Sequence, residues 1–253
     1  MPTRKRPAPA PAPKGPPADV GELLHRLGTA IPSPQCELDH QDPWTLLIAT
    51  ILSAQSTDRT VNTVTPVLWK KWPTPTALAA APREEVEEVV HRTGFFRNKA
   101  KAIQECSLVI AEQHGGEVPR DMASLVKLPG VARKTANVVL GVAFRLAEGI
   151  VVDTHVMRVA QRLGLSTATL ADKVENELCA RLPREQWIDG GHRLLLLGRY
   201  VCLAKAPACQ DCPLAEICPS RQSEPLGSWE ERARHTQERV ESRGTEGSGS
   251  KPA

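Results

Sequence analysis

The apolar residues of this chain recur at the three-to-four-residue spacing of amphipathic helices over most of the interval between its two ends. In residues 98–116, for example, Ile103, Cys106 and Ile110 follow one another at this spacing, and polar residues fill most other positions before a Gly-Gly stop. Such spacing collects apolar side chains on one stripe of an α-helix. No segment alternates convincingly with the two-residue period of a strand. The pattern therefore predicts an all-α protein made of many short helices.

Capping residues and prolines predict where these helices begin. Asp42 precedes Pro43, so its carboxylate is placed to cap free N–H groups while the proline occupies the first turn. Pro82 precedes the segment REEVEEVVHRTG, which Gly94 ends. Further helices are predicted to begin at Asn98, Asp121, Val131 and Asp153, and to cover 171–182 and 186–200.

The two ends of the chain differ in composition from this helical body. Residues 1–18 form a basic arm rich in Pro and Ala, and residues 221–253 form a polar tail. Both are expected to be disordered, with at most a transient helix from Arg221 to Arg243, because neither has enough apolar residues to build a core. Positions 18–218 carry 22 basic and 23 acidic residues. A body this close to neutrality can bind nucleic acid only through a local basic patch.

The composition also bears on the compartment. No apolar stretch approaches the roughly 20 residues of a membrane span, and the N-terminus lacks the apolar centre of a secretory signal. The single cysteines Cys36, Cys106 and Cys179 are expected to be buried, reduced thiols. The chain is therefore predicted to be cytoplasmic, and nucleoid-associated if it is bacterial, with no membrane partner.

The other four cysteines are crowded into a short segment with the spacing C-x6-C-x2-C-x5-C and interleaved prolines. They are Cys202, Cys209, Cys212 and Cys218. Short proline-punctuated loops can direct four thiolates to one centre, whereas two disulfides there would need very tight loops. The spacing predicts a metal centre but leaves both zinc and a [4Fe–4S] cluster open.

A candidate phosphate-binding element lies at residues 123–145, ASLVKLPGVARKTANVVLGVAFR, which are predicted to be helix, tight turn and helix. The first N–H groups of the second helix have no partner in that helix, and together with the helix dipole they favour an anion such as phosphate. From this motif alone, Lys134 is a phosphate contact, and Asp153 is the N-cap of the helix that it begins.

Several motifs together resemble the endonuclease III family of DNA glycosylases. The segment LPGVARKTA is similar to the family's helix-hairpin-helix element, and LSAQSTD at 52–58, VDTHV at 152–156 and the cysteine spacing also match. The resemblance covers about Asp19 to Cys218. It implies a two-domain helix-hairpin-helix glycosylase fold with a C-terminal [4Fe–4S] loop. Residues 36–146 would form one domain, and 19–35 with 147–220 the other.

The resemblance further implies a bifunctional DNA glycosylase and AP lyase that removes oxidised pyrimidines from damaged duplex DNA. In this reading Lys134 is the nucleophile and Asp153 is its carboxylate partner. Positive charge develops on the sugar as the amine attacks the anomeric carbon and the bond to the base breaks, and a carboxylate stabilises that charge. The Schiff base then permits elimination of the 3′ phosphate. The four cysteines would hold a structural [4Fe–4S] cluster, and no nucleotide cofactor or second subunit is expected.

Other residues become candidate DNA contacts through the same resemblance. Gln55 takes the position of the glutamine that fills the gap left by a flipped nucleotide, and Phe95 that of an apolar wedge. An exposed helix-end glutamine and core packing of Phe95 or Phe96 are the plainer alternatives. The remaining candidate contacts are Gly130, Ala132, Arg133 and Lys205, with a basic cluster of Arg92, Arg97, Lys99 and Lys101 around the wedge.

One position departs from the family pattern. Ala132 stands where the family commonly has a second glycine, which predicts a weaker or displaced phosphate contact without loss of function.

Three rival functions remain at this point: an adenine glycosylase, a monofunctional glycosylase for thymine or uracil opposite guanine, and a DNA-binding protein without catalysis. Lys134 argues against the first, because that branch of the superfamily lacks the lysine. A module for metal storage or electron transfer alone would not explain the hairpin.

Overall fold

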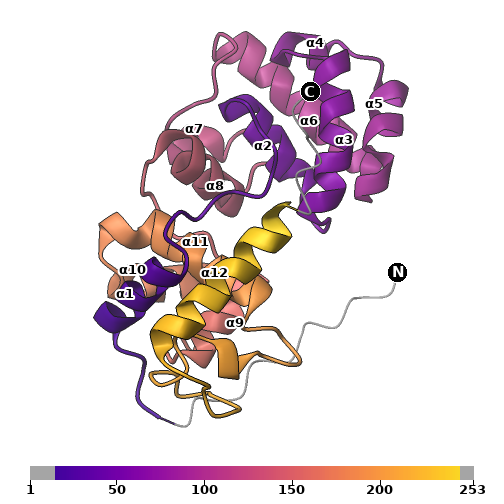
Figure 1. The fold of residues 1–253 in the computed structure, drawn as a ribbon. Coiled ribbons are helices and arrows are strands. Elements are labelled where there is room, and N and C mark those ends of the chain that lie inside the picture. The colour runs from indigo at the N-terminus through magenta and orange to yellow at the C-terminus, as the bar shows by residue number, and fades with distance from the viewer. Residues whose placement is uncertain (1–14, 246–253) are drawn as a thin grey trace. The chain divides into compact units, whose positions relative to one another are not determined.

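The computed structural model describes residues 15–245, and these contain helices and loops but no β-strand, which confirms the predicted all-α class. The chain divides into two compact units (Figure 1). The first, called the hairpin unit below, is Cys36–Glu148, and the division also assigns to it the chain from Arg243 onward, with the last described residues of α12. The second, called the cysteine unit, joins the described residues up to Gln35 with Gly149–Ser242. The unit boundary after Glu148 lies two residues beyond position 146, where the resemblance places it.

The hairpin unit is built around α2, whose residues are nearly all buried. Asp42 caps this helix in a reciprocal capping box with Thr45, as its sequence predicts. Helices α3, α6 and α8 pack against α2, while α4 and α5 cover α6 (Figure 1). The helices of this unit are α2 (Pro43–Leu52), α3 (Asp58–Lys71), α4 (Pro75–Ala79), α5 (Arg83–Val90), the 3-10 turn η1 (His91–Thr93), α6 (Phe96–Gln113), α7 (Met122–Leu125) and α8 (Arg133–Phe144).

Two helices of this unit begin away from their predicted positions. Helix α6 begins at Phe96, not at Asn98, because Phe95 adopts a left-handed conformation and is itself the N-cap. Helix α8 begins at Arg133, two residues after Val131, because the Pro-Gly turn still occupies Val131 and Ala132 is the N-cap.

The cysteine unit has its core between α9 and α11. These helices meet closely at Gly198, where an added Cβ would lie 2.9 Å from the Cβ of His155. Helix α1 also packs on α11. Its elements are α1 (Val20–Ala30), α9 (Thr154–Arg162), α10 (Ala171–Arg181), the 3-10 turn η2 (Arg184–Gln186), α11 (Trp187–Tyr200), the 3-10 turn η3 (Cys209–Asp211) and α12 (Trp229–Thr245).

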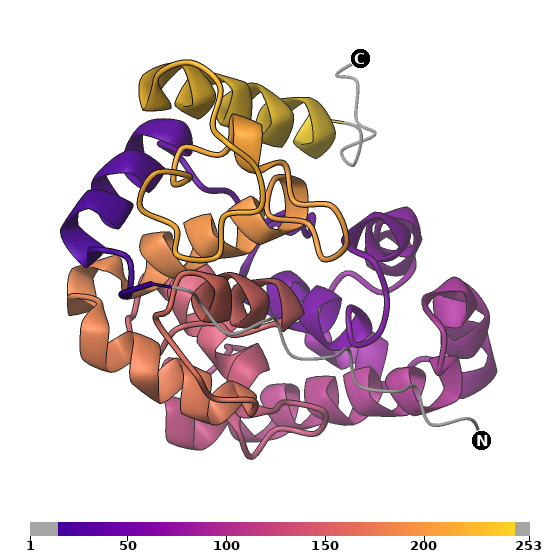
Figure 2. The same cartoon turned by 90° about the horizontal axis from the view of Figure 1, so that it is seen from below.

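Helix α12 corrects the prediction of a disordered tail from 221 onward. It runs beside α1 and along residues 202–218, which carry the four clustered cysteines and are called the cysteine loop below, in both views (Figures 1 and 2). Arg232, Ala233 and Thr236 on this helix are buried. Its sequence is too polar for hydrophobic spacing to reveal it. Hydrogen bonds of a buried arginine and one short apolar strip hold it in place, and neither produces a helical hydrophobic pattern.

The predicted arm at the other end is also partly ordered. Residues 1–14 and 246–253 lie outside the described residues. Ala18, the last residue of the predicted arm, is buried, and its N–H donates to the Leu163 carbonyl at 2.9 Å. None of the helices within residues 15–245 is both long and apolar enough to cross a membrane.

Candidate functional site

The hairpin is a tight turn between α7 and α8. The Val131 N–H donates to the Leu128 carbonyl at 3.1 Å, and Gly130 has a φ of +77°. A side chain at Gly130 would be strained by that φ and would also meet the Cβ of Ala102 at 2.9 Å. Glycine is therefore required at this position by both backbone conformation and packing.

The N-terminus of α8 has features that favour the binding of an anion. Ala132 has extended backbone angles (φ −89°, ψ 166°), and in the described part of the chain no side chain caps this helix end. Ala132 therefore offers no side-chain acceptor to the first N–H groups of α8, in contrast to α9, where the Asp153 carboxylate accepts two such hydrogen bonds. The structure thus brings Gly130, Ala132, Arg133 and Lys134 together at a single helix start.

Lys134 lies in the first turn of α8 with an exposed side chain. The neighbouring Arg133 is also exposed, and its guanidinium donates to the Glu148 carbonyl at 3.3 Å. This hydrogen bond ties Arg133 to the loop that follows α8. An exposed amine at a helix start that favours anions suits either a phosphate contact or attack on a bound sugar.

Gln55 and Phe95 share an unusual backbone conformation. Their φ values are +56° and +49°, and both side chains are exposed, Phe95 by 61%. Left-handed conformations in residues other than glycine cost free energy and often mark functional sites. Phe96 instead packs partly against the core, with its ring centroid 4.5 Å from that of His91. Of the two phenylalanines, Phe95 points outward and Phe96 inward.

The basic cluster predicted around Phe95 loses one member in the structure. Lys99 is only 5% exposed, and its Nζ donates to the Thr93 carbonyl at 2.6 Å. Burial lowers the pKa of Lys99. Lys99 therefore stabilises the turn just before Phe95 and is not part of a surface patch. The other three members of the predicted cluster, Arg92, Arg97 and Lys101, are exposed. Sequence reasoning missed this role because the spacing of a lysine does not reveal its depth.

Asp153 is the N-cap of α9, as predicted. Its Oδ1 accepts hydrogen bonds from the N–H groups of His155 and Val156, both at 2.8 Å, and the residue is partly buried. His155 lies against α11 and its Nδ1 is 3.3 Å from a guanidinium nitrogen of Arg158. The cap holds the carboxylate through two backbone N–H groups. Asp153 belongs to the cysteine unit and Lys134 to the hairpin unit.

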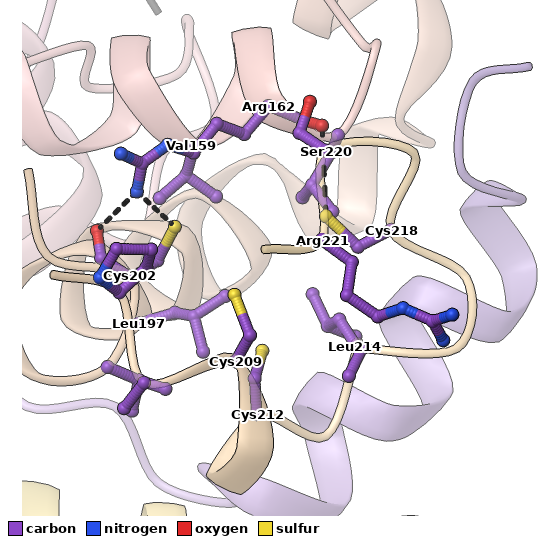
Figure 3. Close-up of a pocket in the computed structure, with 15 residues that line it drawn as sticks. Val159, Arg162, Leu197, Cys202, Cys209, Cys212, Leu214, Cys218, Ser220 and Arg221 are labelled. Atoms are coloured by element: carbon purple, nitrogen blue, oxygen red, sulfur yellow. Dashed lines mark hydrogen bonds between the residues drawn. The ribbon is translucent and has the colours of Figure 1, made fainter. Parts of the chain in front are cut away.

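The four clustered cysteines line one cavity of the cysteine unit (Figure 3). The cavity has a volume of about 30 Å³ and is partly open to solvent. All four are free thiols, so the disulfide alternative is not realised. In Figure 3 their sulfur atoms stand around the cavity at separate positions, with Leu197, Leu214 and Val159 completing its apolar wall.

Two arginines of α9 hold the loop that carries the first of these cysteines. Arg162 is buried, and its guanidinium donates to the Cys202 sulfur at 3.1 Å (Figure 3). It also donates to the Leu203 carbonyl at 2.7 Å. Arg158 donates to the carbonyls of Cys202 at 3.1 Å and Gly198 at 2.7 Å. The two lie one helical turn apart, a spacing the sequence displays but sequence reasoning did not use.

The donor set suits a metal–thiolate centre. Burial raises the pKa of the Cys212 thiol far above its ordinary value and that of Cys218 to about 11. Such thiols become thiolates when a metal cation displaces the proton, and the nearby guanidinium of Arg162 offsets negative charge. Among residues 15–245 no three His, Cys, Asp or Glu side chains are grouped to hold one metal ion. Cysteine ligands of a four-iron cluster surround a cube and need not meet at one ion.

Lys205 lies in the same loop, between Cys202 and Cys209, and its side chain is exposed. The predicted DNA contacts thus divide between the two units: Lys205 is in the cysteine unit, while the other five are in the hairpin unit.

Comparisons with known proteins agree with this arrangement. Residues 48–184 match the model of the HhH-GPD superfamily of base excision DNA repair proteins. Endonuclease III of Synechocystis is 50% identical over 202 residues, which are 80% of this chain and 92% of that protein. Endonuclease III of Bacillus subtilis is 47% identical over 200 residues, 79% of this chain and 91% of that protein.

Solved structures give the same result. A trapped covalent intermediate between an endonuclease III and DNA, in an estranged-adenine complex, matches with a TM-score of 0.75 and 44% identity. The match covers 79% of this chain and 94% of that one. Both the sequence and the fold therefore place the chain in the endonuclease III family of helix-hairpin-helix base excision repair proteins.

Proposed function

We propose that this chain removes oxidised pyrimidines from duplex DNA and nicks the strand at the resulting site, with Lys134 as nucleophile. As a member of the endonuclease III family it is a DNA glycosylase with AP lyase activity. The observation that carries the residue assignment is the exposed Lys134 amine in the first turn of α8, directly after the phosphate-binding turn. The related endonuclease III that was trapped as a covalent DNA intermediate supports a covalent mechanism.

In the proposed first step, the N–H groups at the start of α8 bind a DNA phosphate. This contact places the sugar of the damaged nucleotide near Lys134. The neutral Nζ attacks C1′, the glycosidic bond breaks, and the base leaves with the bonding electron pair and takes up a proton. Positive charge develops on the sugar during this step, and the Asp153 carboxylate, fixed by its cap, stabilises it.

The second step cuts the strand. The amine bound to C1′ loses a proton and the sugar ring opens, which gives an iminium. The iminium makes the C2′ proton acidic, a base removes that proton, and the C3′–O bond breaks as the 3′ phosphate departs. Water then hydrolyses the iminium and releases Lys134. The lyase step therefore needs the same nitrogen as base removal.

Gln55 and Phe95 are proposed to occupy the space vacated by the flipped nucleotide. Both residues combine a left-handed backbone with an exposed side chain. Phe95 would serve as the apolar wedge, and Gln55 would hydrogen-bond the unpaired base. Arg133 and Lys205 would bind the DNA backbone.

The cofactor proposed for the cysteine loop is a [4Fe–4S] cluster held by Cys202, Cys209, Cys212 and Cys218. When bound it supplies a covalent brace for the loop, since removal of a base requires no electron transfer. The four free thiols around one cavity and the Arg162 hydrogen bond to Cys202 support this proposal. We further propose that the enzyme acts as a monomer in the cytoplasm, needs no nucleotide cofactor, and associates with the nucleoid in a bacterial cell.

A nicking assay on a thymine-glycol duplex tests the role of Lys134. Lys134→Ala and Lys134→Arg should both lose strand nicking by at least about 10³-fold, an effect typical of removing a nucleophile. Lys134→Arg keeps the positive charge, so it should still bind the duplex. Lys127→Ala serves as the control, because it removes an exposed lysine from the preceding part of the hairpin. Nicking by Lys134→Arg at the wild-type rate would reduce Lys134 to a phosphate contact.

A panel of lesion duplexes identifies the preferred substrate and distinguishes the proposed function from the three rival functions. Base release and strand nicking are scored separately on thymine glycol, on adenine opposite 8-oxoguanine, and on thymine or uracil opposite guanine. The proposal expects coupled release and nicking on the oxidised pyrimidine. Release without nicking would favour a monofunctional glycosylase, and binding without turnover would favour a non-catalytic protein.

A further inference from the structure

Helix α12 makes an unusual set of contacts with the cysteine loop. Three of its side chains and the segment leading into it reach the same short stretch, Gln210 to Cys212, inside the C-x2-C pair. No residue of α12 has a role in the proposed chemistry, so its contacts with the cysteine loop indicate a different role for this helix.

Arg232 is the centre of this arrangement and is fully buried. Its Nε donates to the Cys212 carbonyl at 2.9 Å, and one terminal nitrogen donates to the Gly227 carbonyl at 2.6 Å. The other terminal nitrogen forms an ion pair with Glu216. A buried guanidinium is tolerated only when hydrogen bonds satisfy it, and here they connect a cysteine ligand to α12.

Three further contacts hold the residues beside Cys212. Arg239 forms an ion pair with Asp211 at 2.5 Å, and the Thr236 hydroxyl donates to the Asp211 carbonyl at 3.4 Å. The Leu226 N–H, in the segment before α12, donates to the Gln210 carbonyl at 3.1 Å. The 3-10 turn that presents Cys209 and Cys212 is thus bound at three successive residues.

The same loop is held from its other side by α1. Arg26 donates to the Pro213 carbonyl at 3.1 Å and pairs with Glu216 at 2.5 Å, so Glu216 joins both arginines. Burial alone would raise the pKa of Glu216, but the hydrogen bonds from Arg232 and Arg26 outweigh it and the pKa is lowered. Arg26 also stacks over the Trp229 ring at 5.0 Å, which joins α1 to the start of α12.

We infer that α12 is a clamp that keeps the segment from Cys209 to Cys218 closed around the cluster and sets the rate at which iron is lost. The inference rests on the cluster of the proposed function. Release of iron requires Cys209 and Cys212 to move away from the cavity, and that motion breaks the contacts of Arg232, Thr236 and Arg239. Arg232 and Arg239 act as positioning residues, because they touch the loop and not the irons.

The test follows cluster loss from the full-length holoprotein. The absorbance of the cluster at roughly 400 nm is recorded after addition of a ferrous chelator, in wild type and in single variants at equal iron content. Arg232→Met should bleach at least about tenfold faster, which corresponds to about 1.4 kcal/mol in the barrier. Arg239→Ala, whose side chain is partly exposed, should bleach about threefold faster and is expected to fold normally.

Arg234→Ala is the matched control, because it removes the same charge from an exposed position on the same helix. It should bleach at the wild-type rate. If Arg232→Met yields no folded protein, the ratio of Arg239→Ala to Arg234→Ala decides. Equal bleaching rates for those two variants would overturn the clamp.

Iron analysis of the wild type separates this outcome from failure of the proposed cofactor. About four irons and four sulfides per chain support the cluster, whatever the variants do. Zinc in place of iron would refute both the proposed cofactor and the clamp as stated. Nicking by freshly prepared, iron-replete Arg239→Ala should equal that of wild type, since α12 takes no part in the chemistry.

Discussion

The hairpin and the cysteine loop position their functional side chains by opposite means. At the hairpin, backbone conformation does the positioning: Gly130 turns the chain, an uncapped helix starts, and Lys134 remains exposed. In the cysteine loop, buried side chains do it, because Arg162 and Arg232 bind the carbonyls and sulfur of the loop. The residues proposed to contact DNA are exposed to solvent, whereas Arg162 and Arg232, which position the proposed cluster ligands, are buried.

This contrast predicts how each region responds to substitution. Exposed side chains on a fixed backbone can be replaced with little effect on folding, so their loss should appear in activity or affinity. Buried arginines with several partners stabilise both the fold and the loop proposed to hold the cluster. Their loss should therefore lower the free energy of unfolding and also speed the loss of iron.

Asp153 has a structural and a proposed catalytic role, because its carboxylate caps α9 and is also proposed to stabilise positive charge on the sugar. Asp153→Asn retains a good N-cap, so the free energy of unfolding should change by less than about 0.5 kcal/mol. Loss of the negative charge should slow base release by at least about 100-fold. Asp153→Ala should be just as slow and also lose about 1 kcal/mol of stability. Thermal melts and single-turnover rates measure the two effects, and wild-type turnover by the Asn variant would confine Asp153 to capping.

Gly130→Ala tests whether the hairpin depends on its backbone. The positive φ and the close contact with Ala102 should together cost about 2–3 kcal/mol of stability and weaken duplex binding. Gly115→Ala is the control, because Gly115 has a φ of +61° and open space around it. It should cost only about 1 kcal/mol and leave DNA affinity unchanged. Equal effects of the two variants in chemical denaturation would show that packing at the hairpin is unimportant.

The adjacent phenylalanines allow a comparison within one loop. Phe96→Ala should lower the free energy of unfolding by about 1–2 kcal/mol, because that ring is partly buried against the core. Phe95→Ala should leave stability within about 0.5 kcal/mol yet slow turnover on a lesion duplex about tenfold. Stopped-flow fluorescence of a base analogue opposite the lesion would locate the defect in nucleotide flipping. A reversed pattern would make Phe95 the structural residue.

Ala132→Gly should give the smallest effect. Ala132 already has ordinary extended angles, so a glycine relieves no strain there. Removing its methyl group lets a phosphate approach the α8 N–H groups more closely, and duplex affinity should rise about twofold. Fluorescence anisotropy with a labelled duplex measures this change. Identical affinity in the two proteins would remove any influence of the alanine.

Much of the fold could be predicted from the sequence, because its signals are local. Asp42, Asp153 and the Pro129-Gly130 turn act on their immediate neighbours, and these predictions are confirmed. Helix α12 was missed because the buried Arg232 holds it in place, and an arginine in a sequence is normally expected to be exposed. Lys99 was placed in the wrong environment for the same reason.

The prediction of the site depended more on family resemblance than the prediction of the fold did. The residues alone indicated a metal–thiolate centre and an anion-binding helix start, whereas the nucleophile, the wedge and the lesion came from family resemblance. The supporting residues Arg158 and Arg162 could not be inferred with either approach as used. Their partners are backbone carbonyls about 40 residues away, and the four-residue spacing of the two arginines does not identify such partners.

Borohydride trapping tests the central claim, covalent attack by Lys134, most directly. The wild-type protein is incubated with an oligonucleotide that carries an abasic site, reduced, digested and sequenced by mass spectrometry. A single adduct should form, attached to Lys134, and Lys134→Arg should give none while Lys127→Ala traps like wild type. Absence of an adduct, or an adduct on any other residue, would contradict the account.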